Sequence, residues 1–155
     1  MGKETIDNKL LLISRSVPPS TTGSAIIVEN ILRFFGNDKI VAVGQNSEII
    51  DKERLLGLPQ IHYINSQLSI KGRGQRLLKW LKFKVIVNEI TRVAKKNNVT
   101  HILVIFPDEL YLYAAYKVSK KLNIPLNTWF HNTYLDNTNT WRKILAKYIQ
   151  PRIFN

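Results

Sequence analysis

Residues 101–130 contain a strand–helix–strand unit with the sequence HILVIFPDELYLYAAYKVSKKLNIPLNTWF. Residues 101–106 and 126–130 are expected to be strands. Between them, Asp108 is a suitable N-cap for a helix, and apolar residues recur on one helical side, at Leu112, Ala115, Tyr116 and Val118. A strand that leads through a helix into another strand is typical of a parallel sheet covered on both faces.

The chain before this unit shows the same alternation. Strands are expected at 9–15, 39–43 and 61–65, and a helix at 24–35. The strands read as continuous apolar runs, which indicates burial on both faces. The expected fold is therefore α/β: a Rossmann-like three-layer sandwich with a mostly parallel sheet, formed by residues 1–155 as a single domain. We expect the first strand to lie between the second and the fourth.

Two apolar faces follow one another in residues 72–98. The first is made by Leu77, Leu78, Leu81 and Val85, and the second by Ile86, Val87, Ile90, Val93 and Ala94. These faces point in different directions around one helix, and a straight helix cannot bury both in one core. The sequence therefore predicts a sheet-covering helix at 85–97 and a separate, more peripheral amphipathic segment at 74–84.

Charge is the strongest feature of the composition. The 155 residues include 23 Lys and Arg against 11 Asp and Glu, which gives a formal net charge of +12. This excess favours polyanionic partners, namely nucleic acid, acidic lipid or phosphorylated small molecules.

The absence of cysteine excludes a disulfide framework and a thiolate metal site, and no spacing of His, Asp and Glu predicts a metal centre. Neither a signal peptide nor a membrane-spanning segment is recognisable, so a cytoplasmic protein is expected.

The segment PPSTTGSA, residues 18–25, falls at the carboxyl end of the first strand and the start of the first helix. Free backbone amides and the helix dipole at such a place attract anions and sugar hydroxyls. Thr22, Gly23 and Ser24 are the candidate binding residues, and Gly23 would let a ligand approach the backbone. A plain capping turn is the alternative, and loop chemistry alone favours it.

Two further loops are expected on the same edge of the sheet. His131 and Asn132 follow the fifth strand, and Asp108 follows the fourth. A histidine there can exchange hydrogen bonds with a substrate hydroxyl, whereas a lone histidine is more often structural, and both interpretations stay open. The carboxylate of Asp108 is a candidate substrate ligand, although the role of helix cap is preferred.

Taken together, these loops resemble the N-terminal half of GT-B glycosyltransferases, of the retaining family-four type. The resemblance covers roughly residues 10–148. It is carried by the Pro/Gly/Ser loop, the helix ending in FFG (34–36), the strand HILVIFP (101–107) with AAYKVSKKLNIP (114–125) after it, and the histidine that ends the next strand. The departure is in the first loop, where the family usually has two adjacent glycines and this chain has Thr22-Gly23.

The resemblance implies an acceptor-binding domain for sugar transfer from a nucleotide-sugar donor to a lipid or glycan. It places Gly23 and Ser24 near the donor phosphates and acceptor, and His131 as the catalytic residue that meets the transferred sugar. The nucleotide sugar would be a substrate, and no cofactor or metal is expected. Because the family's donor-binding domain would follow PRIFN (151–155), the chain alone is expected to be inactive. It would then be a gene fragment, a truncated product, or a subunit that docks onto a separate donor-binding partner, and these alternatives stay open.

Residues 74–84 also match a helix lying on an anionic membrane. Arg76, Lys79 and Lys82 follow one side, with leucines opposite and Trp80 and Phe83 toward the boundary. The alternative is a surface helix whose leucines pack on the sheet.

The alternative function of the whole chain is a non-catalytic basic module that binds nucleic acid or a partner protein. Nucleic acid is disfavoured because few aromatic residues stand among the basic ones. A flavin-binding protein ranks last because the charge has the wrong sign.

Overall fold

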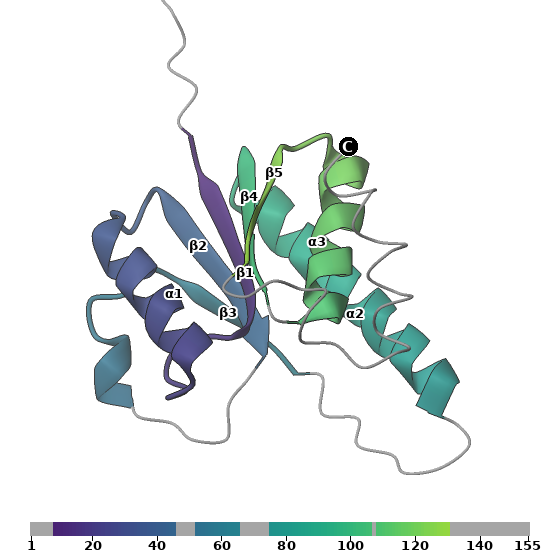
Figure 1. The fold of residues 1–155 in the computed structure, drawn as a ribbon. Coiled ribbons are helices and arrows are strands. Elements are labelled where there is room, and N and C mark those ends of the chain that lie inside the picture. The colour runs from purple at the N-terminus through teal and green to yellow at the C-terminus, as the bar shows by residue number, and fades with distance from the viewer. Residues whose placement is uncertain (1–7, 46–51, 66–74, 107, 131–155) are drawn as a thin grey trace, which may run out of the picture.

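The computed structural model describes residues 8–45, 52–65, 75–106 and 108–130, coloured in Figure 1. Five parallel strands form one sheet in the order β3-β2-β1-β4-β5. The strands are β1 (Leu10–Ser16), β2 (Ile40–Gln45), β3 (Ile61–Ile64), β4 (His101–Ile105) and β5 (Leu126–Trp129). The helices are α1 (Gly23–Phe34), α2 (Gln75–Lys96), α3 (Glu109–Leu122) and the short 3₁₀ helix η1 (Lys52–Leu55).

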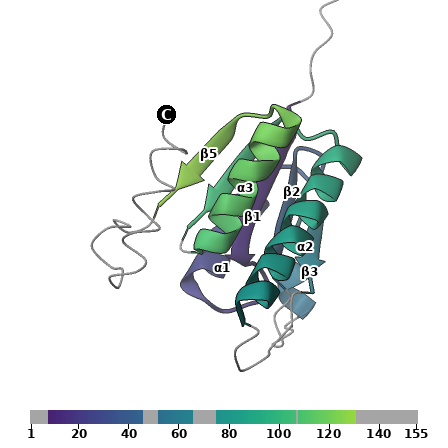
Figure 2. The ribbon, with the colours of Figure 1, turned by 90° about the vertical axis from the view of Figure 1, so that its right-hand side faces the viewer.

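Helices cover both faces of the sheet, so the α/β, Rossmann-like three-layer prediction is confirmed. Helix α1 lies on one face, and α2 and α3 lie side by side on the other (Figures 1 and 2). Alternate side chains of β1 enter the two cores: Leu11 and Ile13 pack on the side of α2 and α3, and Leu12 packs on the side of α1. The strand is buried on both faces, as its continuous apolar run predicts.

Strand β1 is central, and the predicted flanking by the second and fourth strands is confirmed. Leu10 is paired with Ile40 of β2 on one side and with His101 of β4 on the other. The amide of Lys9 donates to Oγ1 of Thr100 at 3.0 Å, just before both strands begin. The sheet therefore joins segments that are 91 residues apart in the sequence.

The prediction of two separate helical segments at 74–84 and 85–97 is wrong, because α2 is one helix from Gln75 to Lys96. Its second apolar face, which includes Ile86 and Ile90, is buried on the sheet. On the first face Leu81 is 40% exposed and Val85 is 44% exposed. Figures 1 and 2 show the first turns of α2 extending past the sheet. The helix can stay continuous because the described residues of the first face, Leu81 and Val85, are not buried in the core.

The ends of α3 follow the local sequence. Oδ1 of Asp108 accepts the amides of Leu110 at 3.0 Å and Tyr111 at 3.1 Å, so the predicted N-cap is confirmed. At the other end Asn123 adopts a left-handed conformation (φ 54°) and donates its amide to the carbonyl of Ser119. Asp108 is thereby fixed at the carboxyl end of β4.

Candidate functional site

The carboxyl edge of the sheet contains a topological switch point between β1 and β4. The chain leaves β1 toward α1 on one face, whereas it leaves β4 toward α3 on the other (Figures 1 and 2). In open parallel sheets ligands bind in the crevice that such diverging connections create. Residues 17–22 after β1 and Asp108 after β4 both lie at this edge.

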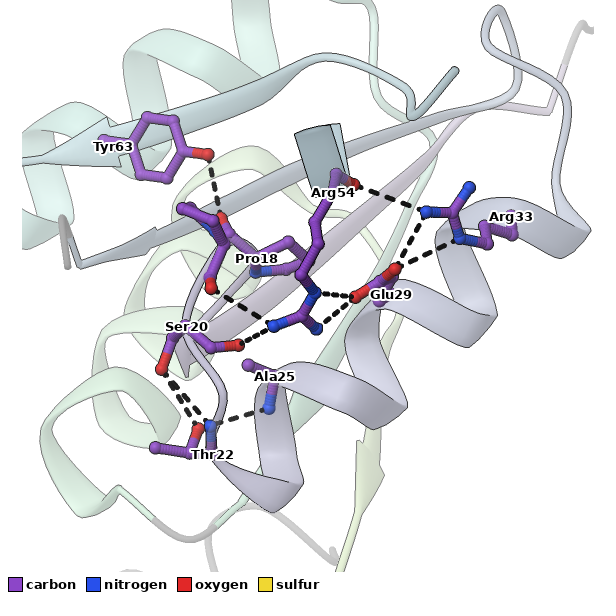
Figure 3. Close-up of polar contacts among 9 residues, drawn as sticks. Pro18, Ser20, Thr22, Ala25, Glu29, Arg33, Arg54 and Tyr63 are labelled. Atoms are coloured by element: carbon purple, nitrogen blue, oxygen red, sulfur yellow. Dashed lines mark hydrogen bonds and ion pairs between the residues drawn. The ribbon is translucent and has the colours of Figure 1, made fainter. Parts of the chain in front are cut away.

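Side chains from other parts of the chain donate hydrogen bonds to the backbone carbonyls of the loop after β1. Oη of Tyr63 in β3 donates to the carbonyl of Pro18 at 2.8 Å. Nη1 of Arg54 in η1 donates to the carbonyls of Pro19 at 3.2 Å and Ser20 at 3.1 Å (Figure 3). Three consecutive carbonyls are therefore fixed by two side chains that come from elsewhere in the chain, and Pro18 and Pro19 are themselves buried.

Arg54 is in turn oriented by α1. Its Nε and Nη2 both donate to Oε2 of Glu29, and Nη2 of Arg33 donates to Oε1 of the same carboxylate at 2.8 Å (Figure 3). Burial alone would raise the pKa of Glu29, but the hydrogen bonds and charges of Arg33 and Arg54 outweigh it and leave this pKa below its ordinary value. The loop is thus tied to α1, η1 and β3 by one connected network.

Thr22 is the N-cap of α1, as one of the two interpretations of the loop predicts. Its Oγ1 accepts the amide of Ala25 at 3.4 Å. Gly23 is exposed, and a Cβ added to it would meet no atom within 4 Å. Within the described part of the chain, the amides of Gly23 and Ser24 have no hydrogen-bond partner. The start of α1 is therefore open to solvent, and glycine is not required there by packing. A binding role of Thr22, Gly23 and Ser24 stays a prediction.

The other predicted residues are distributed as follows. Asp108 shares the carboxyl edge with the loop after β1. His131 and Asn132 follow β5 but lie outside the described residues. Arg76, Lys79 and Trp80 belong to the first turns of α2, and their side chains also lie outside the description, whereas Lys82 is described and half-buried.

Sequence reasoning missed the residues that shape this edge, namely Arg15, Gly44, Arg54, Tyr63 and Glu29. Their partners are distant in sequence: Arg54 and Pro19, for example, are 35 residues apart. The one usable signal was Gly44 at the end of an otherwise apolar strand, because a strand glycine often marks a bulge or the close approach of another chain segment.

The described residues contain no group of His, Cys, Asp and Glu suited to holding a metal ion. Among the described helices, none is both long enough and apolar enough to cross a membrane. The sequence matches no protein-family model and no curated protein.

Proposed function

We propose that this chain is the acceptor-binding domain of a GT-B glycosyltransferase of the family-four type, which takes part in sugar transfer from a nucleotide-sugar donor to a lipid or glycan. The observation that carries the proposal is the loop after β1. Arg54 and Tyr63 hold it at the switch point, and the start of α1 beside it is open. The Rossmann-like fold around it is the one that the sequence resemblance implies.

The chemistry of the open helix start suits a glycosyl acceptor or a phosphate. Amides of Gly23 and Ser24 and the hydroxyl of Ser24 are donors for hydroxyl or phosphate oxygens. Transfer from a nucleotide sugar relies on donors that stabilise the leaving diphosphate, so a site poor in carboxylates is compatible with it. In this proposal His131 is the catalytic residue, no metal or other cofactor takes part, and a further donor-binding domain or subunit binds the nucleotide sugar.

Ligand titration of the ¹⁵N-labelled chain tests the proposal, with N-acetylglucosamine linked to farnesyl diphosphate and a nucleotide sugar as probes. In NMR spectra, we expect the amide chemical shifts of residues 22–24 to change saturably with the lipid-linked probe. We expect no sugar transfer by the chain alone. Gly23→Val should abolish the shifts without lowering stability, since a side chain there points into open space. Asn30→Val, an exposed change further along α1, is the control. Unaltered binding by Gly23→Val would contradict the site.

The alternative of a basic nucleic-acid-binding module has less support. The described surface does hold aromatic residues beside lysines: Phe83 stacks on Tyr113, which stacks on Tyr116, with centroids 5.3 and 6.0 Å apart. Lys117 and Lys120 lie over the two tyrosine rings. These ring faces already have partners, whereas binding of single strands requires faces on which bases can stack.

Membrane attachment is the second part of the proposal, and the outer face of α2 supports it. Leu81 and Val85 are exposed there, so these two residues are available for contact with lipid. Phe83 packs against α3, so it is not at a lipid boundary. We propose that this face lies on anionic lipid at the cytoplasmic side of a membrane, with Arg76, Lys79, Trp80 and Lys82 at the headgroups.

Co-sedimentation with liposomes tests the attachment. Binding is expected with vesicles of acidic lipid, and not with neutral ones, and it should weaken as salt is added. Changing Arg76, Lys79 and Lys82 together to Glu should abolish it. The control changes Lys39, Lys95 and Lys96 to Glu. These exposed lysines lie near the amino ends of β2 and β4, away from the start of α2, and the net charge changes by the same amount. Equal losses in both triple variants would show attraction by net charge alone and would contradict the proposed face.

A further inference from the structure

Strand β1 is irregular where it reaches the carboxyl edge. Its register with β2 shifts between Ile13 and Ser16, so β1 carries one extra residue there. Ser14 is buried at this point, and its Oγ donates to the carbonyl of Ser16 at 2.9 Å. Such bulges change the direction of the side chains near them.

The irregular segment rests directly on Gly44 of β2. A Cβ on Gly44 would lie 2.4 Å from Cγ1 of Val17 and 2.5 Å from the carbonyl oxygen of Ser14. No side chain larger than hydrogen fits this position without movement of the backbone. The bulge and the glycine together fix how the end of β1 leaves the sheet.

The residue inside the bulge is Arg15, and its side chain crosses the ends of three strands. Nε donates to Oε1 of Gln45 at the end of β2, at 3.2 Å. Nη1 donates to Oδ2 of Asp108 after β4, at 3.3 Å. The other oxygen of Asp108 accepts the two amides at the start of α3, so the carboxylate is fixed by bonds that do not involve Arg15. Arg15 is oriented from both sides at the switch point.

Arg15 nevertheless keeps unused donors. Its side chain is 59% exposed, and its two bonds leave Nη2 without a partner among the described residues. A planar guanidinium offers paired N–H groups that match the oxygens of a phosphate. Because Nε and Nη1 hold Gln45 and Asp108, Nη2 can bind a phosphate oxygen while both of these contacts remain.

We propose that Arg15 is a phosphate-binding residue at the β1–β4 switch point. It binds a phosphate or diphosphate group of the ligand, with Gln45 and Asp108 orienting its guanidinium. The source of the phosphate, a lipid diphosphate or a nucleotide sugar, rests on the proposed function, whereas the phosphate site itself does not.

Inorganic pyrophosphate is the first probe, titrated calorimetrically into the whole chain at low ionic strength. Wild type should bind pyrophosphate saturably. The affinity of Arg15→Gln should be lower by at least about tenfold, which is the loss expected when a charged bidentate donor is removed. Arg92→Gln is the matched control, because Arg92 is also 59% exposed and also paired with a carboxylate, that of Glu89. It should bind as wild type does. Unchanged melting temperatures in both variants would show that folding is not affected.

Two further arms identify the source of the phosphate. Farnesyl diphosphate and a nucleoside diphosphate sugar are titrated separately. The probe that matches the natural ligand should lose more affinity when Arg15 is changed to Gln. The proposal is overturned if wild type does not bind pyrophosphate, if Arg15→Gln binds as tightly as wild type, or if Arg92→Gln loses as much. Pyrophosphate binding that depends on Arg15, without any effect of Gly23→Val on the sugar probe, would uphold this site and refute the glycosyltransferase proposal.

Discussion

Arg54 and Glu29 meet through two nitrogens on a single carboxylate oxygen, Oε2, and this arrangement leaves Nη1 of Arg54 for the carbonyls of Pro19 and Ser20. One guanidinium therefore neutralises a carboxylate on α1 and fixes the loop that precedes the same helix. The side chains of Arg54 and Glu29 are only 23% and 13% exposed, so the pair is partly protected from water.

Arg54→Lys should lower the free energy of unfolding by about 1–3 kcal/mol, because an ammonium group cannot reach the carboxylate and both carbonyls at once. Denaturant unfolding measures this difference. The control is Arg92→Lys, which alters the exposed pair with Glu89 and should change stability by less than about 0.5 kcal/mol. Equal effects of the two changes would contradict a special role of Arg54.

Glu29 should make the protein sensitive to acid. Its pKa in the folded chain lies below the ordinary value of 4.5, so the folded state favours the ionised carboxylate. The resulting stabilisation is present above the unfolded pKa and is lost as the pH falls through the folded pKa. Urea unfolding at successive pH values should show that wild type is more stable than Glu29→Gln at neutral pH. The difference in the free energy of unfolding should shrink below about pH 4. A difference that is constant with pH would show that the charge of Glu29 is not responsible.

Gly44 and Gly23 should respond oppositely to the same substitution. Gly44→Ala places a methyl group against Val17 and the carbonyl of Ser14, and should cost about 1–3 kcal/mol. Gly23→Ala adds a methyl group in open space at the start of α1, and should leave stability unchanged or raise it by up to about 1 kcal/mol. Thermal melts of the two variants check this, and a larger loss for Gly23→Ala than for Gly44→Ala would refute it.

Asp108 has two contacts that substitution can separate. Asp108→Ala removes the N-cap of α3 and should cost about 1 kcal/mol. Asp108→Asn retains a capping oxygen and should cost much less, although it removes the charge that faces Arg15. Denaturant unfolding distinguishes them. If the Asn variant is as unstable as the Ala variant, the ion pair with Arg15 and not the cap stabilises this end of α3.

The strands and two of the helices could be predicted because their signals are local. The run at Leu10–Ser16 is apolar throughout, and Asp108 stands directly before a helical pattern, so neither inference needs a distant partner. The position of the first strand between the second and the fourth followed from general rules of connection in parallel sheets.

Helix α2 was mispredicted for a physical reason. The two apolar faces are present in the sequence, but a break between them is needed only if both faces are buried in one core. Leu81 and Val85 are exposed, so the two faces need not share one core and the helix need not break.

The network of the candidate site was out of reach for a different reason. Arg54, Tyr63 and Arg15 act on partners between 25 and 93 residues away, and one sequence does not indicate which polar side chains will meet.

The central position of β1 has a consequence for synthesis on the ribosome. The cluster beneath α1 is nearly complete once β2 has emerged, since its buried members apart from Ile105 lie within residues 12–42. The opposite cluster needs α2, β4 and α3, so Leu11 and Ile13 stay uncovered while these are translated. At common elongation rates that delay is on the order of seconds. During it the nascent chain presents one open edge of β1 and an apolar sheet face, which is the kind of surface that ribosome-associated chaperones capture.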